Sequence, residues 1–368
     1  MKYKFLHIGV HNSLNKNAGD TLLFDLVRKT FERFYSEIEW DLKQLWEPTS
    51  EDEIIRINEE YDAIILGGGG VLLRDQKGAD SSKSGWQWNI EKSIVDKINI
   101  PLIIFAIGYN RFRNQEDFDQ IFKNNIRSVV SKSSFFGLRN NGSIEALKKY
   151  LPEELKCRLS RQFCPTTFAN NINEITTDYL NSNNLSIAFN PSFDRLEMRF
   201  GKTLETSLNK ISKILKESQE LGFEIILTAH KHIDLEMENF LLENNVKYKL
   251  MNLTNASSSE ISSFYSSVTI AFGMRGHAQM IPFGLGIPIF SIITHDKLTF
   301  FLNDINKPEW GEEVNSKDFR LKFFKVLNTV KNQEIIIKDE IKLCQKTIWK
   351  ETSENMNLIK SIIERNYN

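Results

Sequence analysis

The chain of 368 residues is longer than one hydrophobic core usually supports, so its length predicts two domains. Its 47 Lys and Arg residues nearly balance 48 Asp and Glu residues, so no overall field favours nucleic acid as a partner. Its 3 cysteines lack CxxC spacing, which excludes a disulfide framework and a cysteine-rich zinc site. The longest apolar runs are much shorter than the roughly 20 residues of a membrane span. We therefore expect a cytoplasmic protein, at most peripheral to the inner face of a membrane.

In the first half of the chain, short apolar runs alternate with longer amphipathic segments. A polar loop extends to Asp20 after the first apolar run. Continuous apolar strands separated by helices are typical of a parallel sheet covered on both faces. The pattern predicts helices at 21–34 and 141–151, and strands at 4–10, 62–70, 100–109 and 133–139.

The same alternation resumes after a polar, Asn-rich stretch at 159–184, which we interpret as the passage between two domains. The helix at 203–221 is closed by Gly222, a residue typical of helix ends. The other predicted elements are strands at 185–191, 223–230, 246–253, 268–274 and 287–292, and helices at 234–244, 258–267 and 277–286. From Asn332 onward the pattern is that of an amphipathic helix packed on the domains. The predicted divisions are 1–170, 171–331 and 332–368.

The stretch "NAGD" lies between the first predicted strand and the first predicted helix. Asp20 is well placed to be the N-cap of that helix, which would be a purely structural role. Alternatively, the loop around Asn17 and Gly19 faces the cleft and meets an anion or a sugar hydroxyl.

Four consecutive glycines, Gly67, Gly68, Gly69 and Gly70, follow the second buried strand in "LGGGGVLL". Each glycine loses more backbone entropy on folding than any other residue, so a run of four needs a reason. A turn whose backbone N–H groups form a nest for an anionic ligand is one reason. Close packing of the strand is the alternative. The run is not a Rossmann fingerprint, because Leu72 stands where the third glycine is required. It is not a Walker A loop either, since the only Gly-Lys-Thr, at 201–203, has Leu196 where the first glycine is required.

Arg275 and His277 stand two residues apart in "GMRGHA", where an apolar strand ends and a helix begins. A guanidinium matches carboxylate or phosphate, and an imidazole can exchange a proton near neutral pH. We predict both as catalytic and donor-binding residues, with Asp20 as a third catalytic group. Alternatively, Arg275 pairs with a buried carboxylate and His277 caps a backbone carbonyl.

Several further residues are weaker candidates. Arg139 and His230 each end a predicted strand, so we place both at the cleft as donor-binding residues. Trp86 and Trp88 could stack on sugar rings, although aromatic residues at such positions are more often part of the core. No cluster has convincing spacing for a metal, so no metal is predicted.

Together these stretches resemble the polysaccharide pyruvyl transferase family. The resemblance rests on "NAGD", "LGGGGVLL", "FAIGY", "GLRNNGS" and "GMRGHA" before "GLGIP", in the family's order. It implies an α/β fold of two Rossmann-like domains with parallel sheets facing across a cleft, as in GT-B glycosyltransferases. It also implies a last helix that returns to the N-terminal domain.

The resemblance further implies transfer of pyruvate from phosphoenolpyruvate to a sugar, as a cyclic ketal. Arg275 and His277 fall on the positions that hold the donor. Asp75 matches an acidic residue near the family's active site, so we group it with Asn17, Trp86 and Trp88 as acceptor-binding residues. This sequence departs from the family at Asn190, where an arginine is frequent; the next arginine is Arg195.

The predicted partners are therefore phosphoenolpyruvate, as co-substrate without a further cofactor, and a lipid-linked or nucleotide-linked sugar acceptor. Two alternatives remain open. A glycosyltransferase of the same plan would bind the diphosphate of a nucleotide sugar at the glycines and Arg275. A non-catalytic protein would bind a glycan or phosphate without releasing phosphate from a donor.

Overall fold

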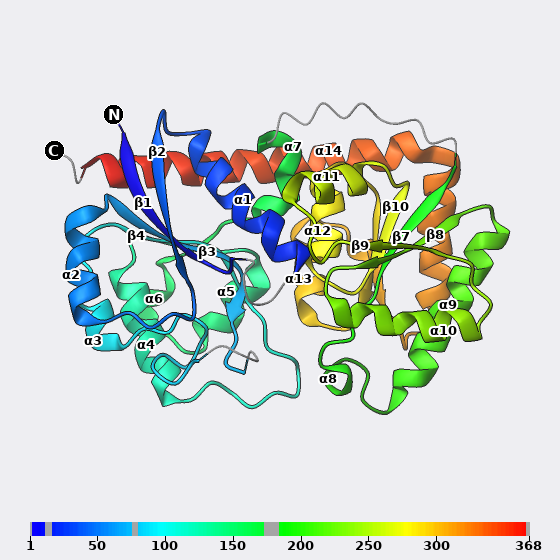
Figure 1. Ribbon diagram of the computed structural model, residues 1–368, viewed down its shortest axis with the longest axis horizontal. Helices are drawn as coiled ribbons and strands as arrows, with labels where there is room; N and C mark the ends of the chain where they lie inside the picture. Colours follow the sequence, from blue (N-terminus) through cyan, green and yellow to red (C-terminus); the bar gives the residue numbers. More distant parts are fainter. Residues whose placement is uncertain (1, 12–16, 76–79, 173–183, 366–368) are drawn as a thin grey trace.

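The computed structural model describes residues 2–11, 17–75, 80–172 and 184–365. In these residues two α/β halves lie side by side, each built around its own parallel sheet (Figure 1). No helix in these ranges combines the length and apolar character that a membrane span needs.

The N-terminal half holds a sheet in the order β2-β1-β3-β4-β5-β6. Its strands are β1 (Tyr3–Gly9), β2 (Ile38–Gln44), β3 (Ala63–Leu72), β4 (Leu102–Tyr109), β5 (Phe135–Leu138) and β6 (Leu159–Arg161). Its helices are α1 (Ala18–Glu32), α2 (Glu51–Glu60), α3 (Lys92–Val95), α4 (Gln120–Lys132), α5 (Asn141–Lys148), α6 (Glu153–Lys156), α7 (Ala169–Ile172) and the 3-10 helix η1 (Pro165–Phe168).

The C-terminal half holds a sheet in the order β12-β11-β10-β7-β8-β9. Its strands are β7 (Ser186–Asn190), β8 (Glu224–Ala229), β9 (Lys249–Asn252), β10 (Ile270–Gly273), β11 (Ile289–Ile293) and β12 (Gly311–Glu313). Its helices are α8 (Leu196–Phe200), α9 (Leu204–Glu220), α10 (Met237–Glu243), α11 (Ser258–Ser266), α12 (His277–Gly284), α13 (Asp296–Asp304), α14 (Phe319–Arg365), and the 3-10 helices η2 (Gly201–Thr203), η3 (His232–Glu236) and η4 (Pro308–Trp310).

All strand pairs in both sheets are parallel, as the apolar runs predicted. The strand order reverses between β1 and β3 in one sheet and between β10 and β7 in the other. Ligands of such sheets bind outside the carboxyl ends of the strands at this reversal. The fold therefore places two potential binding edges opposite each other.

The long helix α14 crosses from the C-terminal half to the N-terminal half, as predicted (Figure 1). Glu351 forms a bidentate ion pair with Arg161, and the Lys360 ammonium donates to the carbonyl of Phe34 at 2.9 Å. The helical pattern expected from Asn332 belongs to a helix that already begins at Phe319 and is kinked at Gln333. One hydrophobic core cluster accordingly spans both halves.

Several predicted boundaries were wrong. The first helix begins at Ala18, with Asn17 rather than Asp20 as its N-cap. β2 and α2 were missed because β2 is half exposed and carries few apolar residues. The stretch 159–184, predicted as a passage, contains β6, η1 and α7. Its residues 173–183 lie outside the described ranges.

Candidate active site

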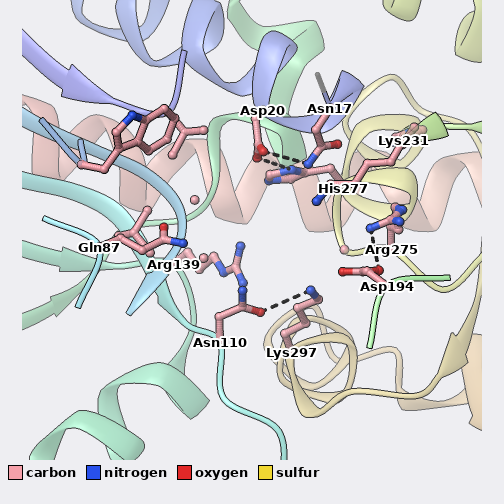
Figure 2. A pocket seen from close by; sticks show the side chains of 17 residues that line it. Asn17, Asp20, Gln87, Asn110, Arg139, Asp194, Lys231, Arg275, His277 and Lys297 are labelled. Carbon is pink, nitrogen blue, oxygen red and sulfur yellow. Dashed lines mark hydrogen bonds and ion pairs between the residues drawn. The ribbon is translucent and has the colours of Figure 1, made fainter. Parts of the chain in front are cut away.

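The carboxyl ends of the two sheets enclose a cavity of about 130 Å³ (Figure 2). Residues after β1, β2, β4 and β5, the glycines of β3 and the start of α1 contribute one side. Residues after β7, β8, β10 and β11 contribute the other side. The cavity thus lies where both strand orders reverse. The predicted meeting of the glycine run with Arg275 and His277 occurs here, since Gly69, Gly70 and both of those residues line it.

The glycine run does not form the predicted turn, because all four glycines belong to strand β3. Gly67 allows close packing: a Cβ there would lie 1.9 Å from the carbonyl oxygen of Phe105 on β4. A Cβ at Gly70 would lie 2.9 Å from the side-chain amide of Asn110. The run therefore gives β3 a surface without side chains, of which Gly69 and Gly70 face the cavity.

Arg275 is engaged by carboxylates. Its Nε donates to Asp234 Oδ2 at 2.8 Å, its Nη2 donates to Asp234 Oδ1, and its Nη1 lies 3.0 Å from Asp194 Oδ1. Asp234 is completely buried and also accepts from the backbone N–H groups of His230 and Lys231. The structure thus shows the alternative interpretation of Arg275, pairing with a buried carboxylate. Its role in holding a donor stays a prediction.

His277 begins α12 and lies against the first turn of α1 from the other half. Its Nδ1 is 3.7 Å from Asp20 Oδ1, and its Nε2 is 3.8 Å from the Cys164 thiol. Gly19 makes room for the ring, because a Cβ there would lie 2.5 Å from His277 Nδ1. Burial, then the positive charges of Arg139 and Lys297, lower the pKa of His277 well below its usual value. These surroundings therefore favour the neutral form of the imidazole.

Asp20 and Asn17 approach the cavity from the start of α1, as predicted. The Asn17 side chain accepts from Gly19 N–H and donates to Asp20 Oδ2 at 2.7 Å. Burial raises the pKa of the Asp20 carboxyl, although the positive charge of Lys231 and the bond from Asn17 act in the opposite direction.

Arg139 points its guanidinium into the cavity from the end of β5 (Figure 2). The residue is only 5% exposed, and its Nε and Nη2 have no hydrogen-bond partner among the described residues. A buried donor without a partner loses the free energy of its bonds to water. Arg139 is therefore the residue of this cavity most in need of an anionic ligand.

Two lysines also line the cavity, and neither was among the predicted site residues. Lys297 follows β11 at the start of α13, and its ammonium donates to Asn110 Oδ1 at 3.3 Å. Burial, then the positive charges of Arg199 and Arg139, lower the pKa of Lys297 well below its usual value. Lys231 follows β8, and no carboxylate among the described residues pairs with its ammonium. Both lysines follow strands of a parallel sheet, and this position in the sequence could have indicated that they line the cavity.

His230 lines the cavity, as predicted, but its ring is completely buried. Its Nε2 lies 2.6 Å from the hydroxyl of Tyr265, and burial lowers its pKa to about 3. Its carbonyl accepts from Ala18 N–H at 3.2 Å, across the two halves. These contacts give His230 a structural role in joining α1 to β8.

Three predicted acceptor residues lie elsewhere. Trp86 and Trp88 are 0% and 1% exposed and pack in the core of the N-terminal half, so the prediction that they stack on a sugar was wrong. Asp75 lies outside the cavity lining and pairs with Arg195 at 2.8 Å. Asn190 is buried and donates to the carbonyl of Thr228 at 2.6 Å, also away from the cavity lining.

Solved structures with this fold include proteins that act on or bind nucleotide sugars. The UDP-GlcNAc 2-epimerase from Neisseria meningitidis, bound to UDP-GlcNAc, has 10% identity and a TM-score of 0.54, covering 96% of this chain and 100% of its own. S. aureus MnaA with UDP has 9% identity and a TM-score of 0.54, covering 98% of each chain. The wall teichoic acid polymerase TagF has 12% identity and a TM-score of 0.52, covering 100% of this chain and 90% of its own.

At such low identity the likeness concerns the fold alone, and it confirms the predicted GT-B-like plan. No curated protein sequence matches this chain. Residues 9–296, which include every lining residue of the cavity except Lys297, match the family described as polysaccharide pyruvyl transferase. The chain therefore belongs to the polysaccharide pyruvyl transferase family.

Proposed function

We propose that this transferase moves pyruvate from phosphoenolpyruvate to a sugar of a cell-surface polysaccharide or its precursor, forming a ketal. The observation that carries the proposal is the buried guanidinium of Arg139, whose Nε and Nη2 have no hydrogen-bond partner among the described residues, in a cavity that also holds Lys231 and Lys297. A phosphate and a carboxylate on one small donor would supply the missing acceptors. Guanidinium and ammonium groups are the usual ligands of both anions.

The size of the cavity favours a small donor. Its volume of about 130 Å³ is below the roughly 300–1,000 Å³ of pockets that hold drug-sized ligands. A nucleotide sugar would need further space in this arrangement of the two halves. We therefore place phosphoenolpyruvate, rather than a nucleotide sugar, between Arg139 and Lys297.

His277 is the proposed acid. Burial, then the charges of Arg139 and Lys297, hold the pKa of its imidazole well below the usual value. A doubly anionic donor would offset those charges, so proton uptake by the imidazole becomes favourable when the donor binds. Asp20, at 3.7 Å from Nδ1, then faces the imidazolium as its counter-ion.

In the proposed reaction the imidazolium gives its proton to the methylene carbon of the donor, which becomes a methyl group. A sugar hydroxyl bonds to the adjacent carbon and returns its proton to the imidazole. A second hydroxyl then attacks the same carbon, the carbon–oxygen bond to phosphate breaks, and that hydroxyl's proton leaves with the phosphate. The products are a cyclic ketal and inorganic phosphate.

The test combines phosphate release and ligand-dependent melting. The purified protein is assayed for phosphate release from phosphoenolpyruvate with a panel of nucleotide-linked and lipid-linked sugars. Arg139→Gln and Lys297→Met should each weaken phosphoenolpyruvate binding about 10- to 100-fold, the effect of losing a charged hydrogen bond. Arg33→Gln and Lys317→Met, at exposed positions, are the matched controls. A melting shift with UDP-sugars but none with phosphoenolpyruvate would instead favour a glycosyltransferase.

A further inference from the structure

One side of the cavity differs in chemistry from the cationic lining. Val10, Trp46, Val71 and Gln87, all from the N-terminal half, give it neutral side chains. The cations and carboxylates of the cavity come instead from Arg139, the start of α1 and the C-terminal half. The neutral side would meet a hydroxyl-bearing edge of a second ligand, whose remainder lies outside a cavity too small to enclose two ligands.

Gln87 is held by its two neighbours in "WQW". Trp86 and Trp88 are buried in the core, and the Trp86 indole N–H donates to Asn125 Oδ1 at 2.8 Å. Between them the Gln87 side chain lies at the cavity (Figure 2). Gln87 is 7% exposed and its backbone N–H donates to the carbonyl of Val71 at 3.4 Å, whereas its side-chain amide takes part in no hydrogen bond among the described residues. The indoles therefore fix a free carboxamide at the neutral side.

Trp46 follows β2 and is fastened to the same segment. The Asn89 side chain donates to the carbonyl of Trp46 at 3.2 Å, and Asn89 N–H donates to the carbonyl of Leu45 at 3.2 Å. Trp46 is half-buried and lines the cavity together with Gln87. The structure thus holds an aromatic ring and an unpartnered amide together on this side.

We propose that Trp46 and Gln87 form the subsite for the acceptor sugar, an inference that rests on the proposed function. A carboxamide offers both a donor and an acceptor, as each sugar hydroxyl does, whereas a guanidinium or an ammonium only donates. The negative face of an indole attracts the C–H groups of a pyranose ring. A neutral polyol fits this side, and an anionic donor fits the other.

The test uses saturation-transfer NMR with the methyl glycosides of glucose, galactose, mannose and N-acetylglucosamine, in the presence of phosphoenolpyruvate. Wild-type protein should transfer saturation to the ring protons of at least one glycoside. Trp46→Ala and Gln87→Ala should weaken that binding about tenfold, as expected for the loss of one or two neutral hydrogen bonds or of the ring contact. Gln120→Ala, at an exposed position on α4, is the matched control.

The phosphoenolpyruvate melting shift is recorded for every variant. If the shift is present and no glycoside binds, or if glycosides bind equally to wild type and both variants, the subsite is wrong. If wild type shows no phosphoenolpyruvate shift, the proposed function fails. The effect of the two substitutions on glycoside binding then still shows whether Trp46 and Gln87 bind a sugar.

Discussion

Gly108 lies against the guanidinium of Arg139: a Cβ at position 108 would be 2.2 Å from Arg139 Nε and 2.7 Å from its Cζ. Gly108 belongs to β4 and Arg139 follows the neighbouring strand β5. The glycine of "FAIGY" thus creates the space in which the Arg139 guanidinium lies. A second glycine, Gly19, does the same for His277 from across the cleft.

Replacement of Gly108 by alanine should therefore displace Arg139 and weaken phosphoenolpyruvate binding at least about tenfold, since the overlap is relieved only when the Arg139 side chain leaves its position in the cavity. The measurement is a double-mutant cycle. Gly108→Ala should cost little further binding in an Arg139→Gln background, because the two changes act on one interaction. Additive effects of the two substitutions would show that Gly108 acts through another group.

The sequence predicted the alternation of strands and helices because buried parallel strands are continuously apolar. It missed β2, whose outer face is half exposed and whose residues include Glu39, Asp41 and Lys43. The strand is recognisable only from its pairing with β1 along the whole register from Tyr3 to Gly9. Such pairing depends on tertiary structure and produces no regular pattern of apolar residues in the sequence.

The sequence predicted where the candidate site lies better than it predicted the contacts within it. Strand ends in "GLRNNGS" and "GMRGHA" gave Arg139, Arg275 and His277, and all three line the cavity. The carboxylate that pairs with Arg275 was not predicted, because Asp234 comes from a 3-10 helix 41 residues earlier. In "WQW" the tryptophans attracted attention, while the residue that faces the cavity is Gln87.

Stability should fall as the pH decreases below the usual pKa of histidine, because burial lowers the pKa of His7 to about 3. Between about pH 6.5 and 3 the unfolded chain binds a proton that the folded ring does not, so stability is complete above this window and decreases within it. The slope is about 1.4 kcal/mol per pH unit for one such histidine. His230, with its pKa also lowered to about 3, adds an equal slope of the same sign.

Urea unfolding at pH 7.5, 6.0 and 5.0 measures this slope. His7→Gln places an amide where the His7 Nε2 atom meets the carbonyl of Gly67 and removes one titrating group. The variant should lose stability less steeply than wild type as the pH decreases. An unchanged slope would show that His7 is protonated equally in the folded and unfolded chains.

Asp75 and Arg195 should contribute little to stability, although they join the two halves. The Asp75 side chain is 45% exposed and that of Arg195 is 20% exposed, so water and salt screen the pair. Exposed ion pairs are worth about 0–1 kcal/mol. Asp75→Asn should therefore lower the free energy of unfolding by less than about 1 kcal/mol in urea titrations. A larger loss would mean that the pair holds the halves together.

Asp234 should behave in the opposite way. It is completely buried, and its removal leaves the Arg275 guanidinium with only Asp194, which is partly exposed. Breaking a buried ion pair by removing one partner costs about 3–5 kcal/mol, because a buried charge then lacks its counter-ion. Three backbone N–H groups, of Phe193, His230 and Lys231, lose an acceptor as well.

Asp234→Ala should thus destabilise the protein several times more than Asp75→Ala under the same urea conditions. The double variant Asp234→Leu/Arg275→Met should recover part of the loss, because it removes the unpaired charge along with its partner. Recovery of stability would show that the charge of Arg275 is balanced inside the protein by Asp234. Arg139 and Lys297 would then be the side chains available to bind the donor. If Asp234→Ala and Asp75→Ala are equally stable, Asp234 is not needed to balance the charge of Arg275. The Arg275 guanidinium would then also be available to bind the donor.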